Sequence, residues 1–171
     1  MKRKIIAGIV ILILGAGVLL FYFLGGFNPI QIQSENLGQI KLSGLQFRGR
    51  PQDEGLKKTF EKIEDLLKLY PQAKLHTIYF EEPAGKMDTM EVFVGLESIW
   101  VNEMEGLNEI SLDASKAIVA TLSAHRFAMP GPLRVQSKIS DFAQGNGLSK
   151  PEIFIDQIIG PNEVKVIGLS K

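Results

Sequence analysis

The most pronounced hydrophobic feature of the chain is an uninterrupted apolar run near its N-terminus. Ile5–Leu24 reads IIAGIVILILGAGVLLFYFL and contains no charged side chain. As an α-helix these residues rise about 30 Å, enough to cross the hydrocarbon core of a bilayer. A cleaved signal peptide is the alternative, but its apolar core is usually about 7–15 residues long and ends at a small-residue cleavage site. The pattern therefore favours an uncleaved, single-pass transmembrane anchor at residues 1–25.

Basic residues are distributed unevenly around this run. Three of them occupy positions 2–4, and the next one along the chain is Lys41. Because Lys and Arg are enriched on the cytoplasmic side of membrane spans, this bias predicts a cytoplasmic N-terminus and an extracytoplasmic domain. Residues 26–36 mix Gly, Asn, Pro and Gln without helical periodicity, and we interpret them as a linker. The folded domain is then expected at residues 37–171.

The pattern over residues 38–98 predicts a strand, a helix and two strands. Leu56–Tyr70 has apolar residues at helical spacing on one face and Lys and Glu on the other. Asp53 is a suitable N-cap for this helix, and Pro71 ends it. The segment before the helix, QIKLSGLQFRG, and the two after it, HTIYFEEP and MEVFVGL, are typical of strands. The first part of the domain is thus predicted to be a βαββ unit.

The second part repeats this order. SKAIVATLSA predicts a strand, PLRVQSKISDFAQ a helix, and PEIFIDQII and EVKVIGLS two further strands joined by a Gly-Pro-Asn turn. The last strand is nearly the same in both parts, since EVKVIGLS resembles EVFVGLES at residues 91–98. We therefore predict a second βαββ unit at residues 110–171, joined to the first by an acidic connector at residues 99–109. Ile110 and Leu112 are expected to begin a strand that feeds into this second unit.

Each unit has one apolar sheet face and one helix to cover it. The economical arrangement is an α+β domain in which the two tandem βαββ units form one antiparallel sheet with both helices on one face. The length of the chain is sufficient for a single buried core.

Charge and composition narrow the possible functions. The chain has 19 basic and 19 acidic residues, and three of the basic ones precede the apolar run, so the remainder carries a net charge of −3. Nucleic acid is not expected as a partner, because nucleic-acid-binding domains usually present a basic face. There is no Cys, and His76 and His125 are the only imidazoles, so neither a metal site nor a cofactor is expected. Both histidines are predicted at strand ends as ordinary edge residues, with haem ligation as a minor alternative.

Several segments together resemble the gyrase-inhibitor-like (GyrI-like) small-molecule-binding domain, an effector-binding domain built from two SHS2-type βαββ repeats. The segments are IYFEEP in the first unit, GLNEISLDASKAIVATLSAH across the middle, and PEIFIDQ in the second unit. The resemblance covers roughly residues 38–171, and it is closest to members that stand alone behind a membrane anchor. Ser115 stands where the family usually has Gly, and Phe154 where it often has Tyr.

The resemblance implies a groove between the two units that binds bulky, often cationic or aromatic small molecules. The strand glutamate that supports cation binding in the family corresponds to Glu152, and Tyr79, Trp100 and Phe154 are the other candidate ligand-binding residues. A carboxylate beside aromatic side chains would give an organic cation both charge pairing and contact with ring faces. Tyr79 and Phe80 should point to opposite faces of their strand, and we favour Tyr79, on the face away from the helices, as the one in the groove.

Three alternatives remain open at this point. Glu152 follows a proline and could simply begin a strand at the solvent edge. If the domain is instead a small-molecule hydrolase, Glu152 is the candidate general acid or base, although the sequence has no G-x-S-x-G or S-x-x-K motif. Trp100 could be a lid over the groove, a hydrophobic plug, or part of a surface that binds a protein partner at the membrane.

Overall fold

The computed structural model describes residues 2–82, 85, 87–101 and 104–170. The connector expected at residues 99–109 therefore lies partly outside the described residues. The elements are α1 (Lys2–Phe23), β1 (Gln31–Glu35), β2 (Gln39–Gly49), α2 (Glu54–Leu69), β3 (Leu75–Glu81), β4 (Met90–Glu97), α3 (Ser98–Val101), β5 (Asn108–Asp113), β6 (Ala117–Ser123), α4 (Pro132–Gly145), β7 (Ile153–Gly160) and β8 (Glu163–Leu169).

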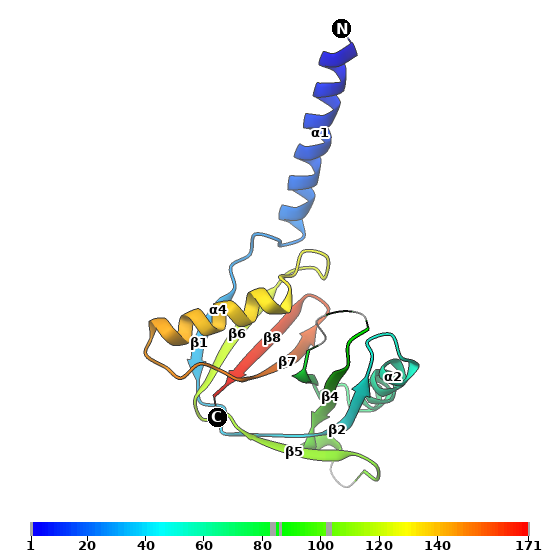
Figure 1. Cartoon of the computed structure of the whole chain (residues 1–171), viewed down its shortest axis with the longest axis vertical. Helices are drawn as coiled ribbons and strands as arrows, with labels where there is room; N and C mark the ends of the chain where they lie inside the picture. Colours follow the sequence, from blue (N-terminus) through cyan, green and yellow to red (C-terminus); the bar gives the residue numbers. More distant parts are fainter. Residues whose placement is uncertain (1, 83–84, 86, 102–103, 171) are drawn as a thin grey trace.

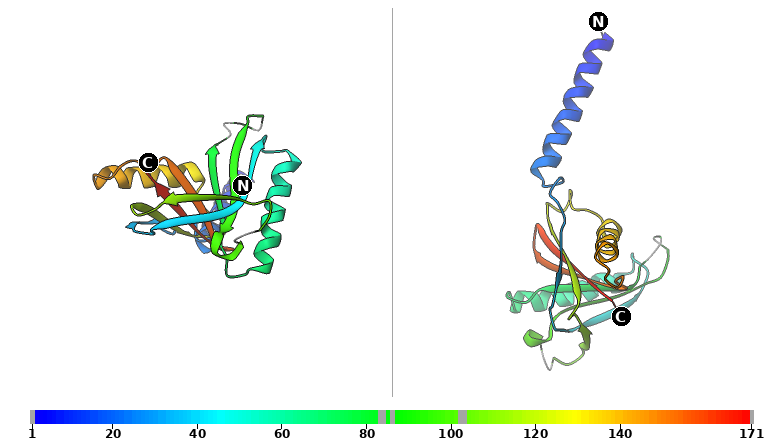
Figure 2. Two further views of the ribbon diagram at one scale, coloured as in Figure 1. Left: turned by 90° about the horizontal axis from the view of Figure 1, so that it is seen from below. Right: turned by 90° about the vertical axis from the view of Figure 1, so that its left-hand side faces the viewer.

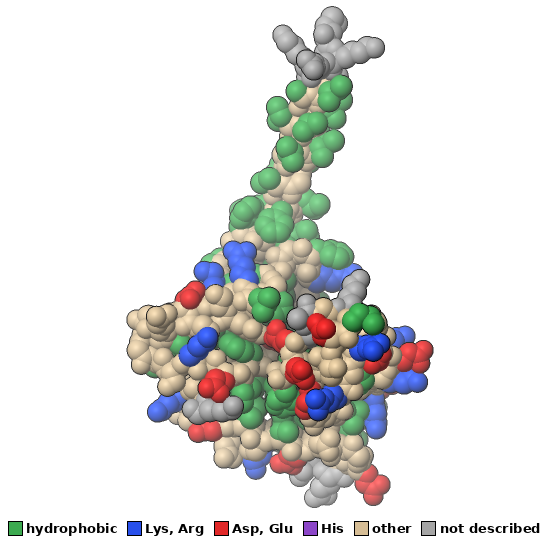
Figure 3. Space-filling view, in the orientation of Figure 1, with side chains coloured by type: hydrophobic (Ala, Val, Ile, Leu, Met, Phe, Trp, Pro, Cys, Tyr) green, Lys and Arg blue, Asp and Glu red, His purple; other side chains and the backbone are tan. Residues whose placement is uncertain are grey.

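Helix α1 projects from the rest of the molecule (Figures 1 and 2). Ile6–Phe23 has a mean hydropathy of 2.7 and none of it is buried, so this helix is long and apolar enough to cross a membrane. Hydrophobic side chains line α1, and the charged side chains seen in Figure 3 lie on the domain.

The end of α1 is fixed to the domain by a tight turn. The Leu24 carbonyl accepts a hydrogen bond from the His125 N–H at 2.8 Å, and the Asn28 side chain donates one to the Ser123 carbonyl at 2.6 Å. Gly25 is left-handed, with φ 78°. A Cβ there would lie 3.2 Å from the Cα of Ala124, so both the conformation and the close approach require glycine.

The predicted α+β fold is confirmed, with two βαββ units in one antiparallel sheet. The first unit is β2-α2-β3-β4, the second is β6-α4-β7-β8, and the strand order is β1-β6-β8-β7-β3-β4-β2-β5. The units meet where β3 pairs with β7 at Ile78↔Ile155. Both helices cover one face of the sheet, which we call the outer face; α2 packs on the side that carries Val94, and α4 on the side that carries Val166. The sheet is strongly curled (Figure 2).

Two edge strands differ from the sequence prediction. Residues 31–35, expected in the linker, form β1 and pair with β6, since Ile32 and its neighbour Ile30 pack against the core beneath α4. The strand predicted around Ile110 and Leu112 exists as β5, but it pairs with β2 of the first unit rather than extending into the second. β1, which precedes the first unit, therefore pairs with the second unit, and β5, which precedes the second unit, pairs with the first.

The segment between β1 and β2 and the segment between β5 and β6 each cross from one unit to the other, and these two crossings contact each other. The Leu37 N–H donates to the Ala114 carbonyl at 3.0 Å, and the Ala114 N–H donates to the Gly38 carbonyl at 2.7 Å. Ala114 is fully buried at this point. This pair of backbone hydrogen bonds links the two crossings, and so connects the ends of β1 and β5, the two edge strands of the sheet.

Both faces of the sheet have their own core. On the outer face, the predicted apolar stripe of α2 packs on β2 and β4 around Ile63, which is completely buried. The opposite, inner face folds onto itself around Leu42, Phe93 and Ile155. A fully buried side chain of this size stabilises the fold by about 1.5–3 kcal/mol. Gly44 permits the curl, because a Cβ there would overlap the backbone of β4.

Candidate functional site

A cavity of about 210 Å³ opens on the outer face, where the two units meet. We call it the outer groove, and it is lined by Tyr79, Phe80, Glu82, Gln136, Glu152, Phe154 and Asp156. Its residues come from β3 and the residue after it, from α4, and from β7 and the residue before it. Three of the four predicted candidates, Glu152, Tyr79 and Phe154, therefore line one cavity.

The alternation of β7 brings an acidic group into this groove that the sequence interpretation missed. Side chains two residues apart in a strand face the same side, so Phe154 and Asp156 lie on one face and Glu152, just before the strand, is at its rim. Burial raises the pKa of Asp156 from its usual 3.8 to about 6, and the negative charge of Glu82 adds to the effect. The signal for Asp156 was present in the sequence as the spacing E-x-F-x-D.

Tyr79 lies on the outer face, not on the face away from the helices as expected. It pairs with Val92, which belongs to the core beneath α2. The register of β3 shifts between Tyr79 and Glu81, and this irregularity allows both Tyr79 and Phe80 to line the groove. The pKa of the Tyr79 hydroxyl is raised, first by burial and then by the charges of Asp156 and Glu82.

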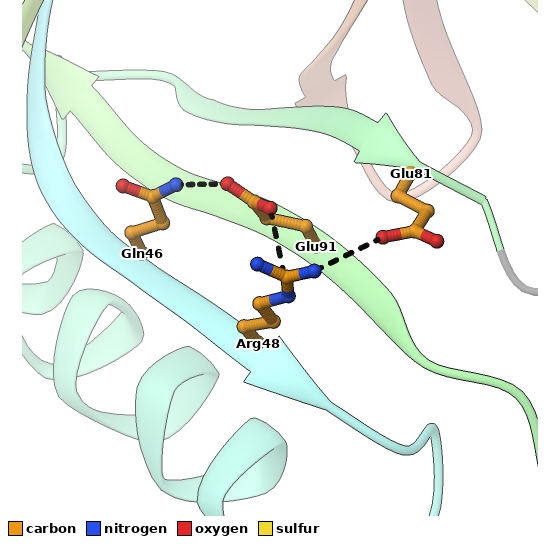
Figure 4. A network of polar contacts seen from close by, with 4 residues as sticks. All are labelled: Gln46, Arg48, Glu81 and Glu91. Atoms are coloured by element: carbon orange, nitrogen blue, oxygen red, sulfur yellow. Dashed lines mark hydrogen bonds and ion pairs between the residues drawn. The ribbon is translucent and has the colours of Figure 1, made fainter.

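Two consecutive glutamates, Glu81 at the end of β3 and Glu82 just after it, contact side chains from different units. The Arg48 guanidinium of β2 lies between the carboxylates of Glu81 and Glu91, with nitrogen–oxygen distances of 4.0 Å and 3.9 Å. Figure 4 shows this arrangement, together with the hydrogen bond that Gln46 donates to Glu91. Glu82 accepts instead a hydrogen bond of 2.6 Å from Gln136 on α4 of the second unit. Exposed ion pairs contribute at most about 1 kcal/mol, so these contacts mainly orient the carboxylates. Glu82 is thereby directed to the groove.

The fourth predicted residue, Trp100, lies outside the outer groove. Trp100 is half-buried in α3 and packs on the core beneath α2, as a plug rather than a lid. Glu152 is exposed and directly precedes β7, and its backbone N–H donates to the Leu169 carbonyl at 2.9 Å. The three carboxylates of the outer groove are not arranged for a metal ion: no group of three His, Asp or Glu side chains among the described residues could hold one.

His76 does not lie at an edge as expected, because β3 is in the middle of the sheet. The ring is 2% exposed; its Nδ1 lies 2.9 Å from the Lys74 carbonyl and its Nε2 lies 3.0 Å from the Gln157 amide nitrogen. Since a carbonyl can only accept, Nδ1 carries the proton and Nε2 accepts from Gln157. Burial lowers the pKa of this imidazole more than Glu97 and the Lys74 carbonyl raise it. His125 lies in the loop beside α1, next to Phe127.

Comparison with known proteins finds similarity in structure only. No family model matches the chain, and no curated protein matches it. A hydrolase from Listeria innocua has a TM-score of 0.58 at 7% identity, over 83% of this chain and 93% of that one. EcmrR, in a complex with DNA, has a TM-score of 0.58 at 9% identity, over 98% of this chain and 68% of that one. An uncharacterized conserved protein from Listeria innocua has a TM-score of 0.55 at 6% identity, over 81% of this chain and 91% of that one. At such identities the likeness shows the fold alone.

Proposed function

We propose that this domain binds a bulky organic cation, without chemical change, in the outer groove between its two repeats. The observation that carries the proposal is the joining of three carboxylates, Glu82, Glu152 and Asp156, with three aromatic side chains in one cavity. A cation there would gain charge pairing and contact with ring faces together, each of which is worth more where water is partly removed. The resemblance to GyrI-like domains supports the same proposal.

The pKa values of Asp156 and Tyr79 are both raised, by burial and by neighbouring negative charge. The pKa of Asp156 lies at about 6 because its ionised form is disfavoured by burial and by Glu82. A bound cation would reverse both effects, since it replaces lost hydration and offsets the charge of Glu82. Binding should therefore strengthen as the pH rises through about 6.

We propose further that α1 anchors the domain to a membrane, with the N-terminus in the cytoplasm. Its apolar length and its exposure along the span support this part of the proposal. The turn beyond the helix holds the domain within a few residues of the end of the span, through the Leu24–His125 hydrogen bond. A domain so close to the bilayer would meet amphipathic compounds where they accumulate.

The test uses two ions of matched size and opposite charge, tetraphenylphosphonium and tetraphenylborate, with the full chain in lipid nanodiscs. Binding is measured calorimetrically, and binding to empty nanodiscs is subtracted. The phosphonium should bind and the borate should not. Asp156→Asn and Glu152→Gln should each weaken binding about tenfold, or about 1.4 kcal/mol. Glu105→Gln, an exposed residue outside the groove, is the matched control. Equal binding of the two ions would refute the proposal.

A hydrolase is the second candidate function, favoured by one specific observation. A carboxyl group with a pKa of about 6 is suited to general acid–base catalysis near neutral pH, and Asp156 has this property. One structural neighbour is a hydrolase. A library of activated esters and strained-ring substrates would test it: turnover that is lost in Asp156→Asn while cation binding persists would favour the enzyme over the binding protein.

A further inference from the structure

The inner face of the sheet contains a second, larger cavity, separate from the outer groove. It has a volume of about 570 Å³ and combines residues from both units. We call it the inner cavity; the lining residues used below are Ile40, His76, Val119, Gln157, Lys165 and Ile167. Neighbouring positions on β7 thus serve opposite faces, with Asp156 in the outer groove and Gln157 in the inner cavity.

A row of polar side chains crosses the floor of the inner cavity. His76 on β3 pairs with Gln157 on β7, which in turn pairs with Lys165 on β8. The next row on the same face is apolar and consists of Ile78, Ile155, Ile167 and Val119. The inner face therefore carries a line of hydrogen-bonding groups beside a row of apolar side chains.

The polar side chains around this row differ in whether they have a hydrogen-bond or ion-pair partner. His76 is neutral and fixed between the Lys74 carbonyl and the Gln157 amide. Two carboxylates of the lining also have donors, because Glu97 accepts from the Lys74 N–H at 2.7 Å and Glu35 from Gln33 at 2.5 Å. Lys165 is half-buried, and no carboxylate in the described part of the chain lies within 4.0 Å of its ammonium.

We propose that the inner cavity binds a small monocarboxylic acid with an apolar body. Its carboxylate would pair with the Lys165 ammonium beside Gln157, and its body would lie on Ile40, Val119 and Ile167. A charge-assisted hydrogen bond to a half-buried ammonium is among the stronger polar contacts. A doubly charged headgroup such as phosphate is disfavoured, because the lining holds three carboxylates, Glu35, Glu97 and Glu109, against only two ammonium groups, Lys41 and Lys165. This site takes the opposite charge to the outer groove and does not depend on it.

The chain contains its own reporter for this site. Trp100 is the only tryptophan, and it follows Ser98 and Ile99, both of which line the inner cavity. All three belong to the short helix α3. A ligand that displaces Ile99 should change the environment of the indole and hence its fluorescence.

The experiment titrates the full chain in nanodiscs with 4-phenylbutyrate and, in parallel, with 4-phenylbutylamine. Trp100 fluorescence and the melting temperature are recorded. The acid should produce a saturable change and the amine should not. Lys165→Met should weaken binding of the acid at least tenfold, whereas Lys62→Met, on the exposed face of α2, should leave it unchanged. Asp156→Asn should also leave it unchanged, which separates this proposal from the outer groove.

Two further variants keep the test decisive if Lys165→Met folds poorly. Lys165→Arg keeps the charge and should still bind the acid, and Val119→Phe should block the cavity while retaining an apolar wall. The proposal is overturned if the amine binds as well as the acid. It is also overturned if the acid gives no saturable change in the wild type, or if Lys165→Met binds it with unaltered affinity.

Discussion

Replacing Asp156 by asparagine should stabilise the domain, and only at neutral and alkaline pH. The carboxyl group titrates at about 6 in the folded protein against 3.8 ordinarily. Between these pH values the folded state holds more protons than the unfolded state, so its stability falls as the pH rises. At about 1.36 kcal/mol per pH unit, the ionised group costs up to about 3 kcal/mol at pH 8. Asparagine has a similar shape and does not ionise.

The assay is urea unfolding followed by Trp100 fluorescence, on a chain that begins at Phe27 and so retains β1. Wild type and Asp156→Asn are compared at each pH, which cancels the titration of every other group. The variant should gain about 2–3 kcal/mol at pH 8, or about 10 °C in melting temperature, and less than about 1 kcal/mol at pH 4. A gain that does not vary with pH would show that the effect is packing, and no gain at pH 8 would show that Asp156 is not held in a dry, negative site.

Three other changes have defined outcomes. Ile63→Ala should destabilise the domain by about 2–5 kcal/mol in urea unfolding, because Ile63 is completely buried beneath α2; Leu69→Ala, 69% exposed on the same helix, should cost less than about 0.5 kcal/mol. Wild type should lose stability relative to His76→Gln as the pH falls below about 6.5, since the folded-state pKa of His76 lies below its unfolded value; parallel pH curves would contradict this. A chain that begins at residue 37 should unfold at lower urea than one that begins at Phe27, because it lacks β1 and the packing of Ile30 and Ile32; equal midpoints would show that β1 is dispensable.

The repeated units could be predicted because their signals are local. The helical stripe from Leu56 to Tyr70 and the alternation in each strand are properties of neighbouring residues, and the elements formed where these patterns indicated. The edge strands were harder to assign. Residues 31–35 contain a single apolar side chain, Ile32, and their strand exists only because β6 offers an unpaired edge far along the chain. Which edge β5 would join depends on the crossing at Ala114, which no local pattern encodes.

The candidate sites also combine features that follow from local sequence patterns with features that depend on long-range strand pairing. The grouping of Glu152 and Phe154 follows from strand alternation, and Asp156 could have been added on the same grounds. The joint presence of Tyr79 and Phe80 depends on a shift of register, and the row from His76 to Lys165 depends on the pairing of three strands that are distant in sequence. Such rows are set by long-range register, to which composition and spacing give no access.

Because β1 and β5 each pair with the unit that they do not precede, the strands must pair in a set order during biosynthesis. As the chain leaves the ribosome, β1 appears directly after α1, but its partner β6 is not complete until Ser123 has been added. The first repeat can close within itself earlier, because β5 follows shortly after β4. Nascent β1 must therefore remain unpaired beside a finished first repeat until β6 has been synthesised. A pause in translation before β6 would leave an unprotected strand next to an apolar helix, the arrangement most prone to association between nascent chains.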